Sequence, residues 1–100
     1  LQSLKKSRVK SPAYLKHVRT FDCLRCDGMT DDAHHPSYSV SRVLSGMGMK
    51  RSGDDDAVPL CRGCHTELHE YSVELQFWLD VGADPIKWAK GRYEKWKTSQ

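Results

Sequence analysis

Two pairs of cysteines constrain the fold of this chain more than any other feature of its sequence. Each pair has the form Cys-x2-Cys, and the four residues are Cys23, Cys26, Cys61 and Cys64. Each such turn presents two sulfurs to one ion, so two turns complete the tetrahedral thiolate shell of structural zinc. We expect a cytoplasmic chain without a secretion signal, in which disulfides are disfavoured. We therefore predict a structural Zn²⁺, with four buried free thiols as the alternative.

The spacing between the two cysteine pairs indicates that the zinc supports something else. The gap is 34 residues, whereas simple zinc ribbons have roughly 15–20. The extra length contains His34-His35 and a glycine-rich stretch. We infer from this that the zinc holds a platform on which other residues act.

Length and charge favour one small domain that binds a polyanion. A chain of 100 residues forms one modest core and often needs a metal to stabilise it. It begins with Leu rather than Met, as expected of a fragment or a processed chain, and it has no apolar run long enough to cross a membrane. Residues 1–20 carry six basic and no acidic side chains, whereas residues 21–70 carry five basic and nine acidic ones. We predict a basic arm over 1–12, for which a merely solvated terminus is the alternative, and a single domain over 13–100.

Local signals predict a small α+β fold. Ser11-Pro12 is typical of a helix start, Gly82 of a helix end, and Asp84-Pro85 of another start. Gly28 is expected to allow the turn of the first cysteine pair. The expected elements are a short helix after Ser11, a strand within 29–38, a long loop over 39–56, a strand over 57–60, and helices over about 61–71, 72–81 and 85–96. The three tryptophans are expected in the core.

Two histidines lie four residues apart on the helix predicted after the second cysteine pair. His65 and His69 therefore share one helix face, while Cys64 belongs to a neighbouring stripe. Two imidazoles one turn apart form half of a site for a catalytic divalent metal. The alternative is a chance pair of surface histidines. The position of the pair directly after a Cys-x2-Cys favours the metal site over chance.

The adjacent histidines His34 and His35 can supply what this half-site lacks. One imidazole can complete the metal shell, and the other can act as a general base near neutral pH. Neighbouring residues of a strand face opposite sides, so the two roles require a bulge or the end of a strand. Pro36 is compatible with such an end.

These motifs together resemble a known nuclease family. They are Ala33-His34-His35, the Gly-Met-Gly-Met-Lys run at 46–50, and Val58-Pro59-Leu60-Cys61-x2-Cys64-His65-x3-His69. The chain is similar over 14–96 to the HNH (ββα-metal) endonucleases, and most to the small phage and prophage HNH proteins that include the recombination-enhancement nuclease. The resemblance implies a ββα-metal finger on a treble-clef-like zinc site with flanking helices. It also implies hydrolysis of DNA phosphodiester bonds.

The resemblance also implies roles for individual residues. His35 would be the general base, and His34, His65 and His69 would bind a catalytic Mg²⁺ or another divalent ion such as Mn²⁺, Zn²⁺ or Ni²⁺, although the roles of His34 and His35 could be reversed. The chain contains no asparagine, so the middle letter of the motif is not met literally. Asp56 stands where the family often has that asparagine, and it could orient His35 or reach the metal.

Basic side chains are the expected contacts to DNA phosphates, with little sequence specificity. The candidates are Lys50, Arg51, Arg42 and Arg62 near the site, and Lys5, Lys6, Arg8 and Lys10 on the arm. The resemblance allows a recombinase filament or another phage recombination protein as a partner. A non-catalytic zinc module that binds nucleic acid or protein is the alternative function, and it leaves the four clustered histidines unexplained. A zinc deaminase is disfavoured because no Glu follows His34 or His35 in a His-x-Glu, and Pro59 lies two residues before Cys61 instead of directly before it.

Overall fold

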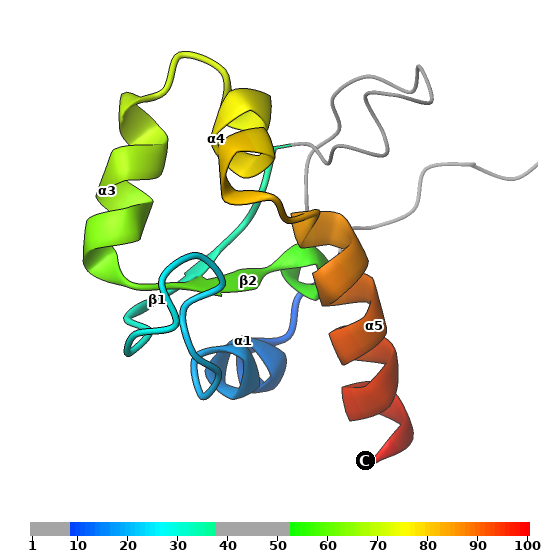
Figure 1. The fold of residues 1–100 in the computed structure, drawn as a ribbon. Coiled ribbons are helices and arrows are strands. Elements are labelled where there is room, and N and C mark those ends of the chain that lie inside the picture. Colours follow the sequence, from blue (N-terminus) through cyan, green and yellow to red (C-terminus); the bar gives the residue numbers. More distant parts are fainter. Residues whose placement is uncertain (1–8, 38–52) are drawn as a thin grey trace, which may run out of the picture.

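Two short antiparallel strands lie at the centre of the part of the chain that the computed structural model describes, residues 9–37 and 53–100. Strand β1 (Asp32–His34) pairs with β2 (Val58–Leu60), and the register places Asp32 opposite Leu60 and His34 opposite Val58. The strands are far apart in sequence but side by side in Figure 1. Helix α3 (Arg62–Glu70) follows β2 almost directly, so strand, strand and helix form one unit.

The remaining helices surround this unit. They are α1 (Pro12–Val18), the 3-10 helix η1 (Asp54–Asp56), α4 (Glu74–Val81) and α5 (Pro85–Thr98). Helix α3 contacts β1 and α4, whereas α5 contacts β2 and η1. In Figure 1, α3 and α5 lie at opposite ends of the strand pair and α1 lies beneath it. The small α+β class predicted from the sequence is thus confirmed.

Helix boundaries follow the local signals of the sequence. The Ser11 hydroxyl accepts a hydrogen bond from the Tyr14 N–H at 3.2 Å, and Pro12 opens α1. The Asp84 carboxylate accepts from the N–H groups of the first turn of α5. Gly82 ends α4 with φ 83°, a left-handed conformation that costs a residue with a Cβ about 1 kcal/mol or more. These three expectations are confirmed.

The turn of the first cysteine pair differs from its prediction. The residue with positive φ is Asp27 at 63°, not Gly28. Aspartate tolerates this conformation because its short polar side chain bonds locally. At Gly28 the constraint is a close approach instead, since a Cβ there would lie 3.3 Å from Cys26 Sγ and the sulfur would have to shift by a few tenths of an ångström. The predicted loop over 39–56 was also wrong at its end, where residues 54–56 form η1.

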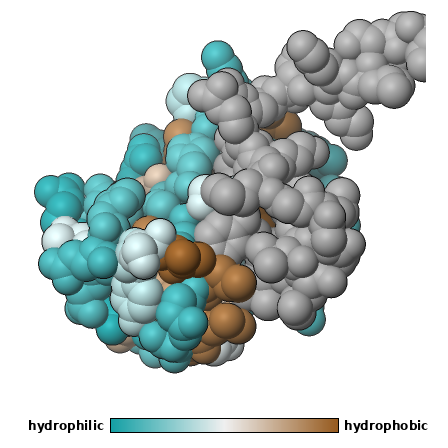
Figure 2. All heavy atoms as spheres, turned by 90° about the horizontal axis from the view of Figure 1, so that it is seen from above, coloured by the Kyte–Doolittle hydropathy of each residue, from teal (hydrophilic) through white to brown (hydrophobic). Residues whose placement is uncertain are grey.

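The core consists of two clusters of buried side chains. The larger cluster contains Trp78, Phe77, Leu60, Val58 and Leu68 together with two of the cysteines, and the smaller contains Tyr14, Val18 and Ala57. Trp78 is fully buried, and Trp88 and Trp96 are partly buried against the clusters, as expected of core tryptophans. Seen from above, the described surface is mostly hydrophilic, and its apolar side chains gather mainly in one area (Figure 2). Within the described ranges no helix is long and apolar enough to span a membrane.

Residues at the start of the described chain are tied to η1. The Asp54 N–H donates to the Val9 carbonyl at 2.8 Å, and the Ser11 N–H donates to Asp54 Oδ2 at 2.7 Å. This part of the expected basic arm therefore lies beside the 3-10 helix. Several predicted DNA contacts are outside the described residues: Lys5, Lys6, Arg8, Arg42, Lys50 and Arg51.

Candidate functional site

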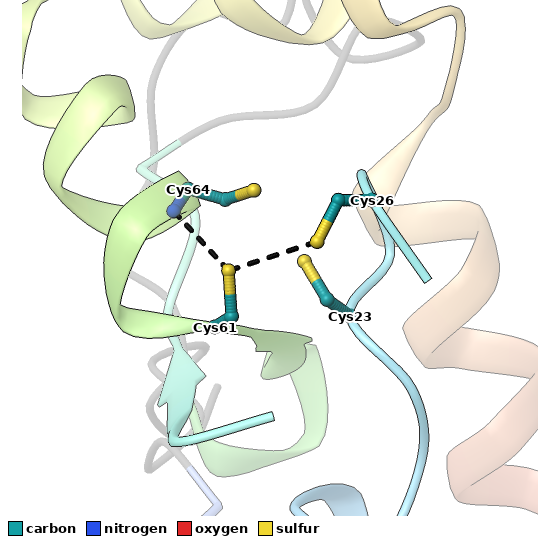
Figure 3. A group of neighbouring side chains, drawn as sticks. All are labelled: Cys23, Cys26, Cys61 and Cys64. Atoms are coloured by element: carbon teal, nitrogen blue, oxygen red, sulfur yellow. Dashed lines mark hydrogen bonds between the residues drawn. The ribbon is translucent and has the colours of Figure 1, made fainter. Parts of the chain in front are cut away.

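The four cysteines converge on one point, as Figure 3 shows. Their sulfur atoms all lie within 4.8 Å of one another, and Cys26 Sγ is 3.7 Å from Cys61 Sγ. Two sulfurs at the usual Zn–S distance of about 2.3 Å from a tetrahedral ion are about 3.8 Å apart. The cysteine cluster therefore fits a structural zinc ion, and the four residues can hold it.

The turns that carry the cysteines are fixed to β2 and α3. The Leu24 N–H donates to the Pro59 carbonyl at 2.9 Å, which attaches the first turn to β2. Cys61 caps the N-terminus of α3, where its sulfur accepts from the Cys64 N–H at 3.3 Å. A helix N-terminus favours negative charge, so this position suits a thiolate.

The thiols cannot all ionise without a cation. Burial raises the pKa of Cys64 to about 12, and the neighbouring thiols add to this. Burial opposes ionisation of Cys23 too, but backbone N–H groups directed at its sulfur outweigh burial and lower its pKa to about 7. Arg25 Nη1 lies 3.5 Å from Cys64 Sγ and offsets part of the negative charge. A divalent cation at the centre would resolve the remaining repulsion.

The three predicted metal-binding histidines form a second cluster, beside a face of α3 that neighbours the one carrying Cys64. The ring centroids of His34 and His65 are 4.8 Å apart, those of His65 and His69 4.8 Å, and those of His34 and His69 6.2 Å. His34 is 7% exposed, whereas His69 is exposed. The face shared by residues 65 and 69 thus meets the end of β1, while Cys64 and Leu68 point into the core.

Two carboxylates determine which nitrogen atoms face each other in this cluster. Glu74 Oε2 lies 2.9 Å from His34 Nε2, and Asp32 Oδ2 lies 3.0 Å from His65 Nδ1. Ionised carboxylates only accept hydrogen bonds, so these two ring nitrogens carry protons. The opposite nitrogens, His34 Nδ1 and His65 Nε2, are 3.1 Å apart. At this distance a proton on one of the two rings would join them by a hydrogen bond, and a metal cation between them would let both rings stay neutral.

The carboxylates themselves are held in the ionised form. The hydrogen bond from His65 lowers the pKa of Asp32, and Arg62 adds to the effect against burial. Burial opposes ionisation of Glu74, but the hydrogen bonds from His34 and Trp78 outweigh it and leave the pKa below its usual value. Both groups are therefore anionic partners of the histidines at neutral pH.

His35 lies just beyond the end of β1 and has a different partner from His34. Its Nε2 is 2.8 Å from Asp54 Oδ1, and its side chain is 38% exposed. The predicted separation of the two histidines at a strand end is confirmed. Burial raises the pKa of Asp54, but the hydrogen bonds from His35 and the Ser11 N–H outweigh burial and lower it overall. The remaining nitrogen of His35, Nδ1, is the one left for other chemistry.

Sequence reasoning missed the carboxylates that contact the histidines. Asp54, Asp32 and Glu74 were not singled out, because they lie 19 to 40 residues from their partners in sequence and no spacing motif joins them. Asp56 lies in the same 3-10 helix as Asp54, and its role remains a prediction. Of the predicted phosphate contacts, Lys10 and Arg62 are described and exposed, and Arg62 donates to Asp32 at 3.2 and 3.3 Å.

Comparisons with known proteins place the chain in a family. It is 35% identical over 72 residues to "Uncharacterized protein YdfU" of Escherichia coli (strain K12), a match that covers 72% of this chain and 20% of that protein. The chain therefore spans about a fifth of the length of that relative. No solved structure matches it. The model of the family described as "Protein of unknown function (DUF968)" matches residues 1–82, and the chain belongs to the DUF968 family.

Proposed function

We propose that this protein is a metal-dependent DNA endonuclease of the HNH type. The observation that carries the proposal is the convergence of His34, His65 and His69 from β1 and α3, with His35 next to His34 at the end of the strand and bonded to a different carboxylate. A strand pair followed by a helix with these side chains is the arrangement expected of a ββα-metal finger. The cysteine cluster supports the finger at the N-terminus of α3, where Cys61 caps the helix.

His34 and His65 bring two ring nitrogens together, and His69, one turn further along α3, would be the third ligand of a catalytic metal. Two nitrogens at about 2.0–2.1 Å from a shared tetrahedral ion lie about 3.4 Å apart, close to the 3.1 Å between His34 Nδ1 and His65 Nε2. Three protein ligands leave coordination positions open, as catalytic sites require. A divalent ion bound there would stabilise negative charge on a phosphate and on its leaving oxygen.

His35 is the general base in this proposal. Asp54 holds the proton on Nε2, so Nδ1 is the atom that takes a proton from the attacking water. The water oxygen bonds to phosphorus, the P–O ester bond breaks, and the departing oxygen takes a proton from solvent. The exposure of His35 leaves room for the substrate beside it. His34 is ill suited to this role because it is buried and bonded through Nε2 to Glu74.

DNA is the proposed substrate because basic side chains flank the site. Lys10 precedes Ser11, whose N–H bonds to the same carboxylate that holds His35. Contacts from such residues go to phosphates and provide affinity without sequence selection. We propose low sequence specificity and a role in phage or prophage recombination or DNA processing, and a recombinase filament as a partner that delivers the DNA.

The test is cleavage of plasmid DNA by the zinc-loaded chain with Mg²⁺ or Mn²⁺. The wild type should nick or linearise the plasmid, and His35→Ala should slow this about 100-fold or more, as loss of a general base does. The matched control is His17→Phe, which changes the one histidine that has no role in the proposed site and should cut like the wild type.

Two results would count against the proposal. Intact plasmid with each divalent metal, both alone and with a recombinase filament, would leave the non-catalytic zinc module as the better explanation, and a gel-shift assay would then show whether DNA is bound. If His35→Ala instead cleaves the plasmid as fast as the wild type, His35 is not the general base.

A further inference from the structure

We infer that Glu74 is the positioning residue of the histidine site: it fixes the ring of His34 with Nδ1 toward the metal and thereby sets the metal affinity. This rests on the proposed function, because the metal is the one that the nuclease would use. Glu74 is the first residue of α4, a helix that the sequence marks only as a packing element.

The surroundings of Glu74 accept only an ionised carboxylate. Its side chain is 10% exposed, and four donors point at its two oxygens. Oε2 receives His34 Nε2 at 2.9 Å and Trp78 Nε1 at 2.7 Å, while Oε1 receives the Ser37 N–H at 3.3 Å and the Ser37 hydroxyl at 3.0 Å. A buried carboxylate is costly unless its oxygens are satisfied, and here both are.

This network fixes His34 from the side opposite the metal. A hydrogen bond to one ring nitrogen decides which nitrogen is free to bind an ion and raises the basicity of that nitrogen. Because Trp78 is fully buried and Ser37 follows the histidine pair closely, Glu74 cannot swing away without breaking contacts to both. The ring orientation is therefore set before an ion binds, which reduces the cost of binding.

Asp32 and Glu74 differ in how firmly each carboxylate is held beside its histidine. Asp32 holds His65 in a similar way, but its side chain is 25% exposed and it is shared with Arg62, which is 73% exposed. Water can replace a lost contact at such a position more readily than in the buried pocket around Glu74. The larger effect on metal binding is therefore expected from Glu74.

The first measurement is calorimetric binding of Ni²⁺ to the full chain with zinc already in the cysteine site. Glu74→Gln keeps the size of the side chain but directs an amide N–H₂ toward donors, and it should weaken Ni²⁺ binding about 10- to 100-fold with the zinc content unchanged. Glu94→Gln, the same change at an exposed position of α5, is the control and should bind like the wild type. Ser37→Ala removes one donor from Oε1 and should change the affinity less than about three-fold.

The second measurement does not depend on the variant folding. The ¹⁵N shifts of His34 in the wild type, without added Ni²⁺ and at about pH 8.5, where an ordinary histidine is neutral, should report a proton on Nε2. A proton on Nδ1 would overturn the inference. The inference would also fail if the Glu74→Gln variant folds and binds Ni²⁺ as tightly as the wild type. Absence of Ni²⁺ binding by the wild type would remove both this inference and the proposed nuclease, whereas normal Ni²⁺ binding without DNA cleavage would remove only the nuclease.

Discussion

Asp54 and His35 form the pair of residues on which the proposed chemistry depends most directly. Asp54→Asn removes the negative charge but keeps an oxygen that can accept from His35 Nε2. A hydrogen bond to a charged group is worth about 1 kcal/mol more than a neutral one, so plasmid cleavage should slow about five-fold. The effect should be smaller than that of His35→Ala in the same assay. An equal loss in the two variants would mean that Asp54 does more than hold the ring.

The lowered pKa of Asp54 leads us to expect that the stability of the fold depends on pH. The pKa of Asp54 is lower in the folded chain than its ordinary value near 3.9, because His35 and the Ser11 N–H favour the charged form. Asp54 therefore stabilises the fold above about pH 4, and this contribution is lost as the pH falls through the lowered pKa.

Urea unfolding of the wild type and of Asp54→Asn at a series of pH values measures this contribution. The wild type should be the more stable at neutral pH, and the difference should shrink on acidification. Loss of zinc at low pH affects both chains alike, so the comparison isolates Asp54. A difference that is constant with pH would contradict the assigned role.

At the scale of helices, two glycines predict opposite effects of one substitution. Gly82 ends α4 at φ 83°, so Gly82→Ala should lower the free energy of unfolding by about 1 kcal/mol. Gly91 lies inside α5, and a Cβ there would meet nothing within 4 Å. Gly91→Ala should therefore raise the free energy of unfolding by about 0.5–1 kcal/mol. Urea unfolding measures both, and a shift of the same sign in both would refute the argument.

The helices also show what the sequence reveals and what it leaves out. Caps such as Ser11, Asp84 and Gly82 act on their own neighbours, so the ends of α1, α4 and α5 could be predicted closely. The cysteine cluster was predictable for the same reason, since each pair is a local motif. The contact of Glu74 with His34 joins residues 40 positions apart, and only the packing of α4 against α3 creates it. Such pairs depend on tertiary structure, and a single sequence gives no spacing from which to find them.

At the scale of the whole molecule, the zinc is expected to hold the turn of Cys23 and Cys26 against the start of α3, which carries Cys64. The first cysteine turn joins β2 through Leu24 and Pro59, and the second opens α3, which carries His65 and His69. In a domain with so small a core, a structural zinc contributes a large part of the folding free energy. Removing it should therefore loosen β2 and α3 and separate the histidines.

Zinc release by a chelator under reducing conditions, followed by calorimetric melting, tests this dependence. The metal-free chain should melt at a much lower temperature or show no cooperative transition, and it should lose plasmid cleavage. His65→Ala is the matched comparison, because it should lose cleavage while it keeps its zinc and melts close to the wild type. His65→Ala should affect cleavage but not zinc binding or melting, because Cys64 and Leu68 face the core whereas residues 65 and 69 face β1. A metal-free chain that melts like the zinc-loaded one would show that the core alone holds α3 in place.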